Sequence, residues 1–292
     1  ALQTWCARMA LLGASAARRV RMPSRSLFQK HVRAMSSLEM SQSEQKIVNL
    51  EEVTGRVHSI ETFSAIDGPG IRYLLFLQGC NLRCKSCSNR DTWEHSGGKI
   101  MTAKEVVTHM LRYRNYIEGL TISGGEALLQ PHFVSAVFQG AHEHGLSTCV
   151  DTTGQCPRQY WDLVLPHTDL ALVCIKHIDA AKYREFAGVP QKPAMEFVDA
   201  LACQYGVPFF LRYLYIPDYS DSDADIDKFL DWASHYRGMV RGIELLPYHR
   251  LGVEKWKSMG LRYELESIPL PDKRAVQRAR RRMEERGFTV LL

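Results

Sequence analysis

The 292-residue sequence lacks the features that would place it in several large classes of protein. No apolar run approaches the roughly 20 residues that a membrane-spanning helix needs, so we expect no membrane partner. The eight cysteines are scattered along the chain and do not form the dense framework of a disulfide-stapled secreted domain. This usage of cysteine implies a reducing compartment.

Acidic residues are absent from positions 1–38, which hold seven of the 37 Lys and Arg residues. Residues 39–292 therefore hold 30 basic and 32 acidic side chains, so the net charge of +5 comes from the first segment. Because the basic charge is confined to that segment, we expect no nucleic-acid partner for the remaining chain.

The composition of residues 1–38, rich in Arg, Ala and Ser and free of acids, is typical of an organellar transit peptide. We therefore predict import into a mitochondrion, hydrogenosome or chloroplast, a polar linker over 39–52 and one folded domain over 53–292. A secretory signal built on the short apolar patch 9–17 and a basic tail without a targeting role are the alternatives.

Strand-like and helix-like segments alternate through the predicted domain. Strands are expected at 53–64, 72–78, 119–122, 146–150, 170–175, 209–215, 242–246 and 288–292, and helices at 102–116, 131–144, 159–165, 180–186, 194–205, 224–236 and 273–286. Six successive strand-then-helix pairs predict an α/β fold with a parallel sheet and right-handed crossovers, curled into a partial (β/α)6 TIM-type barrel.

In such barrels the functional site lies at the carboxyl ends of the strands. The chemically capable residues fall there: Cys80, Gly124 to Glu126, Asp151, Thr152, Lys176, Arg212 and His249. Taken alone, His249 is more often an ordinary loop histidine, and a Gly-Gly pair is a common loop element.

Three cysteines, Cys80, Cys84 and Cys87, follow the second predicted strand in a CxxxCxxC pattern. Three soft thiolates in eight residues suit an iron–sulfur cluster or zinc. Structural zinc usually takes four ligands from two paired halves, and no second CxxC completes such a shell. A cubane cluster with three cysteine ligands keeps one iron open to a substrate. A zinc knuckle and three unrelated core cysteines remain the alternatives.

This cysteine pattern resembles the signature of the radical S-adenosylmethionine (SAM) enzymes, and its flanks narrow the resemblance. GRVHSIE at 55–61, DGPGIR at 67–72, NRDTW at 89–93 and LPYHRLG at 246–252 are similar to the pyruvate formate-lyase-activating enzymes. The similarity runs from about Val53 to the C-terminus, so 53–292 is predicted to be a radical SAM domain.

The resemblance implies an oxidoreductase of anaerobic metabolism. In that family a reduced [4Fe-4S] cluster and SAM generate a 5′-deoxyadenosyl radical, which installs a glycyl radical on pyruvate formate-lyase. It further implies a flavodoxin or ferredoxin-type reductant, a monomer, and no catalytic residue beyond the cluster and SAM.

The resemblance also implies a set of site residues. Cluster ligands are Cys80, Cys84 and Cys87, and SAM-binding residues are Ser86, Ser88, Gly124, Gly125, Glu126, Asp151, Thr152, Cys174, Ile175, Lys176, Arg212 and His249. The SGGE segment would supply acceptors for the SAM ammonium group. Asp67, Gly68 and Arg72 would receive the glycine-containing loop of the partner, and a plain turn with a surface charge is the alternative.

Three residues depart from the family pattern. Ser86 stands where an aromatic residue is usual, and Thr153 stands where the family has Asn. Cys174 replaces an acidic residue that helps Asp151 and Thr152 hold a monovalent cation beside SAM. A neutral thiol is a poor ligand for a hard cation, which predicts that the cation site is altered or lost.

Two other functions stay open from the sequence. One is an activase of a different glycyl-radical enzyme or a radical SAM enzyme acting on a small molecule. Several such activases carry a cysteine-rich insert, and no cysteine lies between Cys87 and Thr102 here. The other is a non-enzymatic metal-binding protein.

Overall fold

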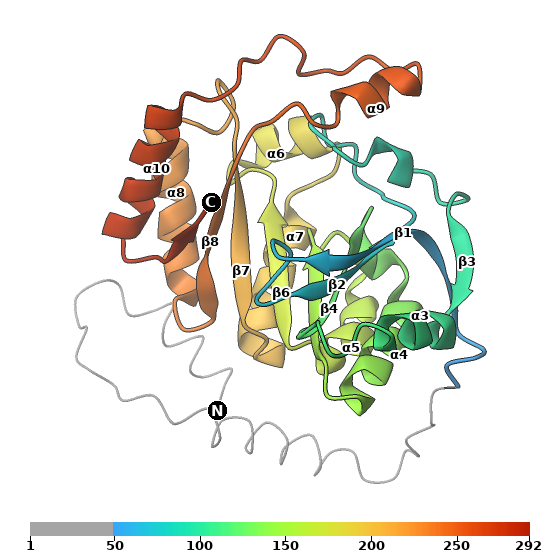
Figure 1. Cartoon of the computed structure of the whole chain (residues 1–292). Coiled ribbons are helices and arrows are strands. Elements are labelled where there is room, and N and C mark those ends of the chain that lie inside the picture. Colours follow the sequence, from blue (N-terminus) through green and yellow to red (C-terminus); the bar gives the residue numbers. More distant parts are fainter. Residues whose placement is uncertain (1–48) are drawn as a thin grey trace, which may run out of the picture. The chain divides into compact units, whose positions relative to one another are not determined.

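The computed structural model describes residues 49–292 (Figure 1). The predicted leader, 1–38, and most of the predicted linker, 39–52, lie outside the described residues. The end of the linker packs against the domain, because Lys104 N donates to the carbonyl of Leu50 at 3.1 Å. Among the described residues, no helix has the length and apolarity to span a bilayer.

The described chain forms one open sheet in the order β3-β1-β2-β4-β5-β6-β7-β8-β9. The strands are β1 (Thr54–Ser64), β2 (Arg72–Leu77), β3 (Lys99–Thr102), β4 (Gly119–Gly124), β5 (Ser147–Thr152), β6 (Leu170–Ile175), β7 (Phe209–Tyr215), β8 (Val240–Pro247) and β9 (Val290–Leu291). The run from β2 through β8 is parallel, which confirms the predicted partial (β/α)6 barrel.

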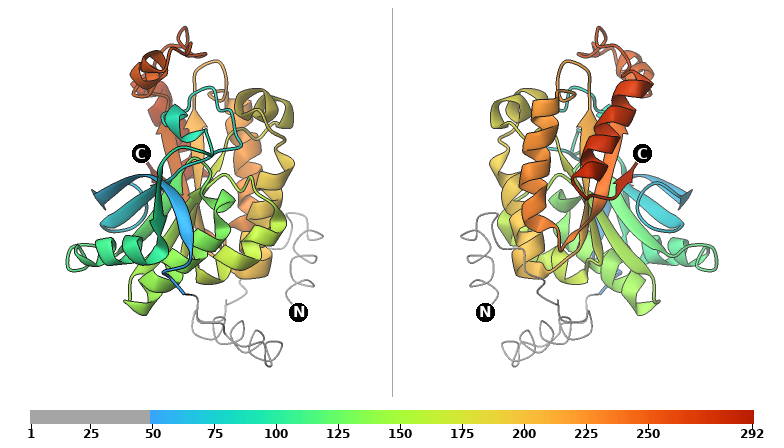
Figure 2. Two further views of the ribbon diagram at one scale, coloured as in Figure 1. Left: turned by 90° about the vertical axis from the view of Figure 1, so that its right-hand side faces the viewer. Right: turned by 90° about the vertical axis from the view of Figure 1, so that its left-hand side faces the viewer.

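Helices connect the parallel strands and gather on the outer side of the curved sheet (Figure 2). The helices of residues 49–292 are α3 (Ala103–Leu111), α4 (Pro131–Glu143), α5 (Trp161–Val164), α6 (Ala180–Ala187), α7 (Lys192–Ala200), α8 (Asp223–Ala233), α9 (Val253–Ser258) and α10 (Lys273–Glu285). Helix α9 stands apart from the others, at the top of Figure 1. The predicted capping box is confirmed at the start of α3, where Thr102 accepts from Glu105 N and the Glu105 side chain bonds back to Thr102 N.

Several boundaries differ from the predictions. Helix α3 ends at Leu111 instead of Tyr116, because the following residues form turns such as Arg112 N to His109 O. The predicted helix 194–205 begins earlier, at Lys192, and closes with a π-helical turn over Leu201–Tyr205. The sequence reading missed strand β3, which pairs antiparallel with β1 at the sheet edge, and the short helix α9.

A buried ion network crosses the inside of the barrel. Arg212 on β7 lies 3.0 Å from Asp151 on β5, 2.6 Å from Glu244 on β8 and 3.7 Å from Asp67 in the loop after β1. Ser123 on β4 donates to Asp151 at 2.7 Å. Burial raises the pKa of Glu244, and the neighbouring Arg212 opposes that rise. One guanidinium therefore neutralises part of the charge of three carboxylates from three segments.

We expect Arg212→Met to lower the free energy of unfolding by about 3–5 kcal/mol near pH 8, because it leaves buried carboxylates without their cation. The deficit should shrink as the pH falls toward about 5. Without Arg212, the folded-state pKa of Glu244 rises further above its unfolded value, so protonation stabilises the folded variant as the pH drops through that pKa. Urea denaturation at the two pH values measures both effects.

Arg280→Met is the matched control, since Arg280 forms an exposed ion pair with Glu284 at 2.8 Å. It should change the free energy of unfolding by less than about 1 kcal/mol at either pH. An Arg212→Met deficit of the same size at both pH values would contradict this account of the network.

Candidate active site

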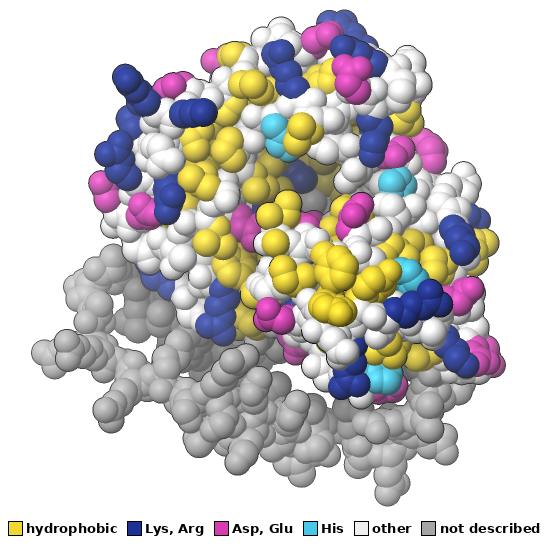
Figure 3. Space-filling model, viewed as in Figure 1, with side chains coloured by type: hydrophobic (Ala, Val, Ile, Leu, Met, Phe, Trp, Pro, Cys, Tyr) yellow, Lys and Arg dark blue, Asp and Glu magenta, His cyan; other side chains and the backbone are white. Residues whose placement is uncertain are grey.

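A cavity of about 550 Å³ opens at the carboxyl ends of the parallel strands. The space-filling view shows this face hollowed, with hydrophobic side chains around the hollow (Figure 3). Most predicted site residues line it: Asp67, Cys80, Cys84, Ser86, Cys87, Ser88, Gly124, Gly125, Glu126, Asp151, Thr152, Cys174, Lys176, Arg212 and His249. The predicted residues that do not line it are Gly68, Arg72 and Ile175.

The cysteine loop is clamped at its two ends by the backbone. Gly79 N donates to the carbonyl of Thr92 at 2.7 Å and Cys80 N to that of Trp93 at 3.2 Å, which closes the loop onto itself. Further along, Arg83 N and Lys85 N donate to the carbonyls at the end of α6, at 2.7 and 3.1 Å. The loop is therefore closed where it begins and ends, and the segment between Cys80 and Cys87 is held by α6.

The three thiols line one cavity and are available as ligands, and their role in holding an iron–sulfur cluster stays a prediction. Cys80, Cys84 and Cys87 are free of disulfides and line the same cavity. Within residues 49–292 no group of three or more His, Cys, Asp or Glu side chains is arranged to hold a metal ion, so the three thiols do not converge on one ion. Burial raises the pKa of Cys80 and of Cys84 to about 12. Such thiols lose their protons to a metal that replaces the charge of the proton.

The glycines of the predicted SGGE motif are required by a close backbone contact. Gly124 has φ +126°, and a Cβ there would lie 2.2 Å from Leu77 N. A Cβ on Gly125 would lie 2.1 Å from the carbonyl oxygen of Gly79. Gly125 N donates to the carbonyl of Leu77 at 2.9 Å, so β4 ends directly against the start of the cysteine loop. Only residues without a side chain permit this approach.

Glu126 has a structural role that the sequence did not reveal. Its buried carboxylate accepts hydrogen bonds from Thr152 Oγ1, from Thr153 N at 2.9 Å and Thr153 Oγ1 at 2.6 Å, and from Leu128 N at 3.2 Å. Burial raises the pKa of Glu126, and these donors oppose the rise. The side chain therefore ties β4 to β5, while its role in binding SAM stays a prediction.

Alternation along β6 separates the residues predicted at its end. Cys174 and Lys176 face the cavity, and Lys176 Nζ lies 3.2 Å from Cys174 Sγ. Ile175 points the other way and is 2% exposed, so its side chain belongs to the core. Burial alone would lower the pKa of Lys176, but the nearby sulfur atoms of Cys174 and Cys84 outweigh this effect. The pKa of Lys176 is therefore raised above its usual value, and the ammonium stays charged.

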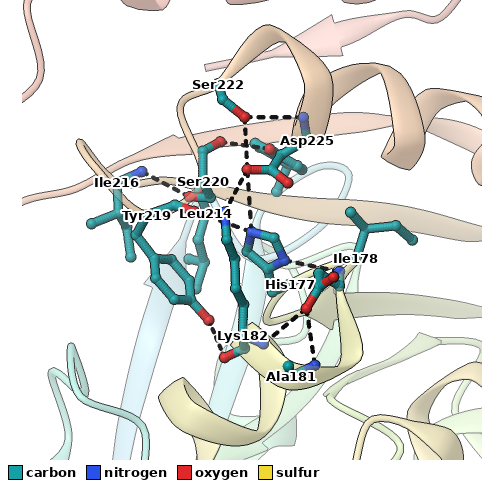
Figure 4. Close-up of polar contacts among 12 residues, drawn as sticks. His177, Ile178, Ala181, Lys182, Leu214, Ile216, Tyr219, Ser220, Ser222 and Asp225 are labelled. Atoms are coloured by element: carbon teal, nitrogen blue, oxygen red, sulfur yellow. Dashed lines mark hydrogen bonds and ion pairs between the residues drawn. The ribbon is translucent and has the colours of Figure 1, made fainter.

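A polar network fixes the segment that follows Lys176 (Figure 4). His177 Nδ1 accepts from Asp179 N at 2.9 Å, so Nε2 carries the proton and donates to the carbonyl of Tyr219 at 3.1 Å. Burial lowers the pKa of His177, which keeps the ring neutral. Lys182 Nζ donates to Asp225 at 2.8 Å and also to the Tyr219 carbonyl. The end of β6 is thereby tied to the segment that joins β7 to α8.

The residues predicted to bind the partner protein lie in different surroundings: Asp67 lines the cavity, whereas Gly68 and Arg72 do not. Asp67 lines the cavity, accepts from Ser64 Oγ at 2.5 Å and offers its carbonyl to Thr121 at 2.6 Å. Arg72 is 3% exposed, and its guanidinium bonds to Thr121, Ser147 and the carbonyl of Leu120. Its placement supports the sheet, and its role in partner binding stays a prediction. Gly68 lies over Arg72 and Thr121.

The sequence reading missed several lining residues. They are Ile66, Phe76, Leu82, Asn89, Thr92, Trp93, Ser123, Thr153, Leu214, Ile216, Leu246, Pro247 and Tyr248. Strand alternation starting from Arg212 would have found Leu214, because residues two apart share a face. Tyr248 and Trp93 belong to motifs already noted in the sequence, but only the fold turns them toward the cavity.

Comparisons with known proteins support the prediction of an iron–sulfur cluster in this chain. A family model described as a 4Fe-4S single cluster domain matches residues 66–172. A pyruvate formate-lyase-activating enzyme of Staphylococcus aureus is 39% identical over 244 residues, which cover 80% of this chain and 96% of that protein.

Two solved structures share the fold. A domain of a pyruvate-formate lyase-activating enzyme from Bacteroides vulgatus is 21% identical, with a TM-score of 0.50 over 59% of this chain and 97% of that one. SuiB of Streptococcus suis, solved bound to S-adenosylmethionine, is 14% identical, with a TM-score of 0.55 over 72% of this chain and 47% of that one. Given the sequence identity and the nearly full coverage of the Staphylococcus relative, this chain belongs to the pyruvate formate-lyase-activating enzymes, a family of radical SAM enzymes.

Proposed function

We propose that this protein activates a pyruvate formate-lyase by removing a hydrogen atom from one of its glycines. The observation that carries the proposal is the shared cavity, in which three free thiols face the ends of β4 to β8. The name of the Staphylococcus aureus relative supplies the identity of the partner. Glycine is a suitable target, since its backbone can enter a foreign site with no side chain to obstruct it.

The cavity offers separate groups for two cofactors. Cys80, Cys84 and Cys87 would hold a [4Fe-4S] cluster, and the backbone at Gly124 and Gly125 would accept from the ammonium group of SAM. When bound, these cofactors supply the one-electron chemistry that removes hydrogen from carbon. The charged Lys176 ammonium suits a carboxylate of the ligand.

The rest of the cavity wall excludes water from the reactive site and leaves an opening for a protein partner. Apolar residues such as Leu214, Ile216 and Leu246 line it and exclude water from a reactive site. Ile66 lines the same cavity and is 82% exposed, so the cavity is continuous with open surface where a protein partner could reach.

We also propose a flavodoxin or ferredoxin-type electron donor, because the chemistry consumes single electrons. We propose a monomer, because every proposed cofactor ligand lies in one chain.

After anaerobic reconstitution we expect about four irons per chain. The reduced protein, mixed with SAM and pyruvate formate-lyase, should produce an organic radical on the lyase in electron paramagnetic resonance (EPR) spectra. Growing the lyase with α-deuterated glycine should change the splitting of that signal, since the radical lies on a glycine.

Cys84→Ser should lose the cluster and the radical, whereas Cys203→Ser is the matched control, because Cys203 does not line the cavity. Retention of full iron by Cys84→Ser would rule out the proposed ligand set. If the wild type cleaves SAM but leaves the lyase without a radical, the partner is a different protein or a small molecule.

We further propose that Cys174 weakens the monovalent-cation site beside SAM. Cys174→Asp should tighten SAM binding about tenfold in the presence of potassium, which corresponds to about 1.4 kcal/mol of binding free energy. The cluster content should stay constant. Calorimetric titrations with and without the cation measure the change. Cys174→Ser is the matched control and should stay insensitive to the cation, because a hydroxyl carries no charge.

Lys176 provides the competing outcome. Its ammonium already lies 3.2 Å from Cys174 Sγ and could pair with the new carboxylate instead. If Cys174→Asp and the wild type give superimposable titrations with and without cation, the proposal for this position is wrong.

We propose organellar import for residues 1–38, supported by their acid-free, Arg-rich composition. Deleting them should abolish import into isolated organelles and leave SAM cleavage by the purified protein unchanged. Import of the truncated protein at the full-length rate would refute this role. Testing mitochondria and chloroplasts side by side distinguishes the organelles.

A further inference from the structure

Cys87 differs from the other two cysteines of the loop in being enclosed by two tryptophans. Trp93 Nε1 donates to Cys87 Sγ at 3.3 Å, and Trp256 Nε1 donates to the Cys87 carbonyl at 2.7 Å. The indoles are 6% and 4% exposed and pack edge to face, with ring centroids 5.6 Å apart. Among the described residues, Trp93 is the side chain that donates to a sulfur of the cysteine triad.

A guanidinium lies against this tryptophan pair. Arg83 Cζ lies 4.9 Å from the centroid of Trp93, but its Nη1 is paired with the carbonyls of Cys80 and Leu82. Arg90 Cζ is closer, at 3.9 Å from the centroid of Trp93, and lies 5.7 Å from that of Trp256. Its Nε and Nη1 are buried and have no hydrogen-bond partner within residues 49–292. Arg90 itself is half-buried, and two buried N–H donors without acceptors are costly, so this guanidinium is held beside the cysteine loop at some expense of stability.

The C-terminal part of the chain holds this arrangement in place. Trp256 lies on α9, and Lys255 from the same helix pairs with Asp91 at 3.0 Å. His58 on β1 bonds to the same carboxylate at 2.8 Å. A Cβ on Gly252 would lie 2.7 Å from Ser88 Cα, so the start of α9 rests directly on the loop.

We infer that Trp93 and Arg90 are positioning residues that raise the reduction potential of a cluster held by Cys87. Hydrogen bonds to cluster sulfurs and nearby charge are the main means by which a protein sets such a potential. Reduction adds negative charge at the cysteine sulfurs. An N–H donor and a cation both stabilise that charge, and the cation over the ring also draws electron density from the indole and strengthens its N–H donor.

This inference rests on the proposed cluster, and its test needs neither SAM nor the lyase. Trp93→Phe keeps an aromatic ring beside Arg90 but removes the N–H donor. At a fixed solution potential, we expect about a tenfold lower ratio of reduced to oxidised cluster, equal to about −59 mV for one electron. An EPR-monitored redox titration of the reconstituted protein measures the ratio, with iron content as a second readout.

Trp161→Phe is the matched control. Trp161 is 2% exposed and donates to Cys156 Sγ at 3.2 Å, which is the same contact on a cysteine outside the cavity. It should titrate as the wild type does, even if its thermal stability falls. If Trp93→Phe also keeps the wild-type potential at full iron content, the inference is wrong.

Arg90 gives a second test if Trp93→Phe fails to retain iron. Arg90→Met should shift the potential in the same negative direction, while Arg90→Lys, which keeps the charge, should shift it less. Identical potentials for wild type, Arg90→Met and Arg90→Lys would overturn the inference in that case. A wild type that titrates normally but leaves the lyase without a radical would instead count against the proposed function alone.

Discussion

The parallel register of β2 and β4 to β8 is the constraint on which the site depends. Residue-by-residue pairing from Arg72–Gly119 through Tyr215–Pro247 keeps these strands in step, so their carboxyl ends face one region of space. Each strand then adds one or two functional residues to that region. Backbone hydrogen bonding therefore decides where the cavity lies, and the side chains that line it decide its chemistry.

Close packing of backbone against backbone connects the sheet to the cysteine loop. Gly124 and Gly125 bring β4 within a distance of Leu77 and Gly79 that any side chain would prevent. This contact fixes where the loop leaves the sheet, and α6 and α9 fix the remainder. The three thiols are thus held by segments from three distant parts of the chain, which favours a rigid set of ligands.

Buried charge is the second organising element, and it appears in two forms. Arg212 draws Asp67, Asp151 and Glu244 together inside the barrel. Glu126 is satisfied instead by neutral donors from Thr152, Thr153 and Leu128. Both arrangements hold neighbouring strands at fixed separations, because a buried charge without its partners would be costly. Residues that resemble ligands in the sequence therefore also hold the fold together.

The sequence by itself determined the fold class and limited the chemistry to a few alternatives, with an iron–sulfur cluster as the prediction. The spacing of Cys80, Cys84 and Cys87 and the alternation of strands with helices are local patterns, and local patterns are set by the periods of helix and strand. They sufficed to place Asp151 and Lys176 at strand ends and to predict the partial barrel.

Only the tertiary structure decided which way side chains face and which distant residues meet. It turned Ile175 into the core, buried Arg72 within the sheet and brought Trp256 onto Cys87 across 169 positions of the chain. Such contacts depend on how crossovers and loops fold back, a long-range property that no local period encodes.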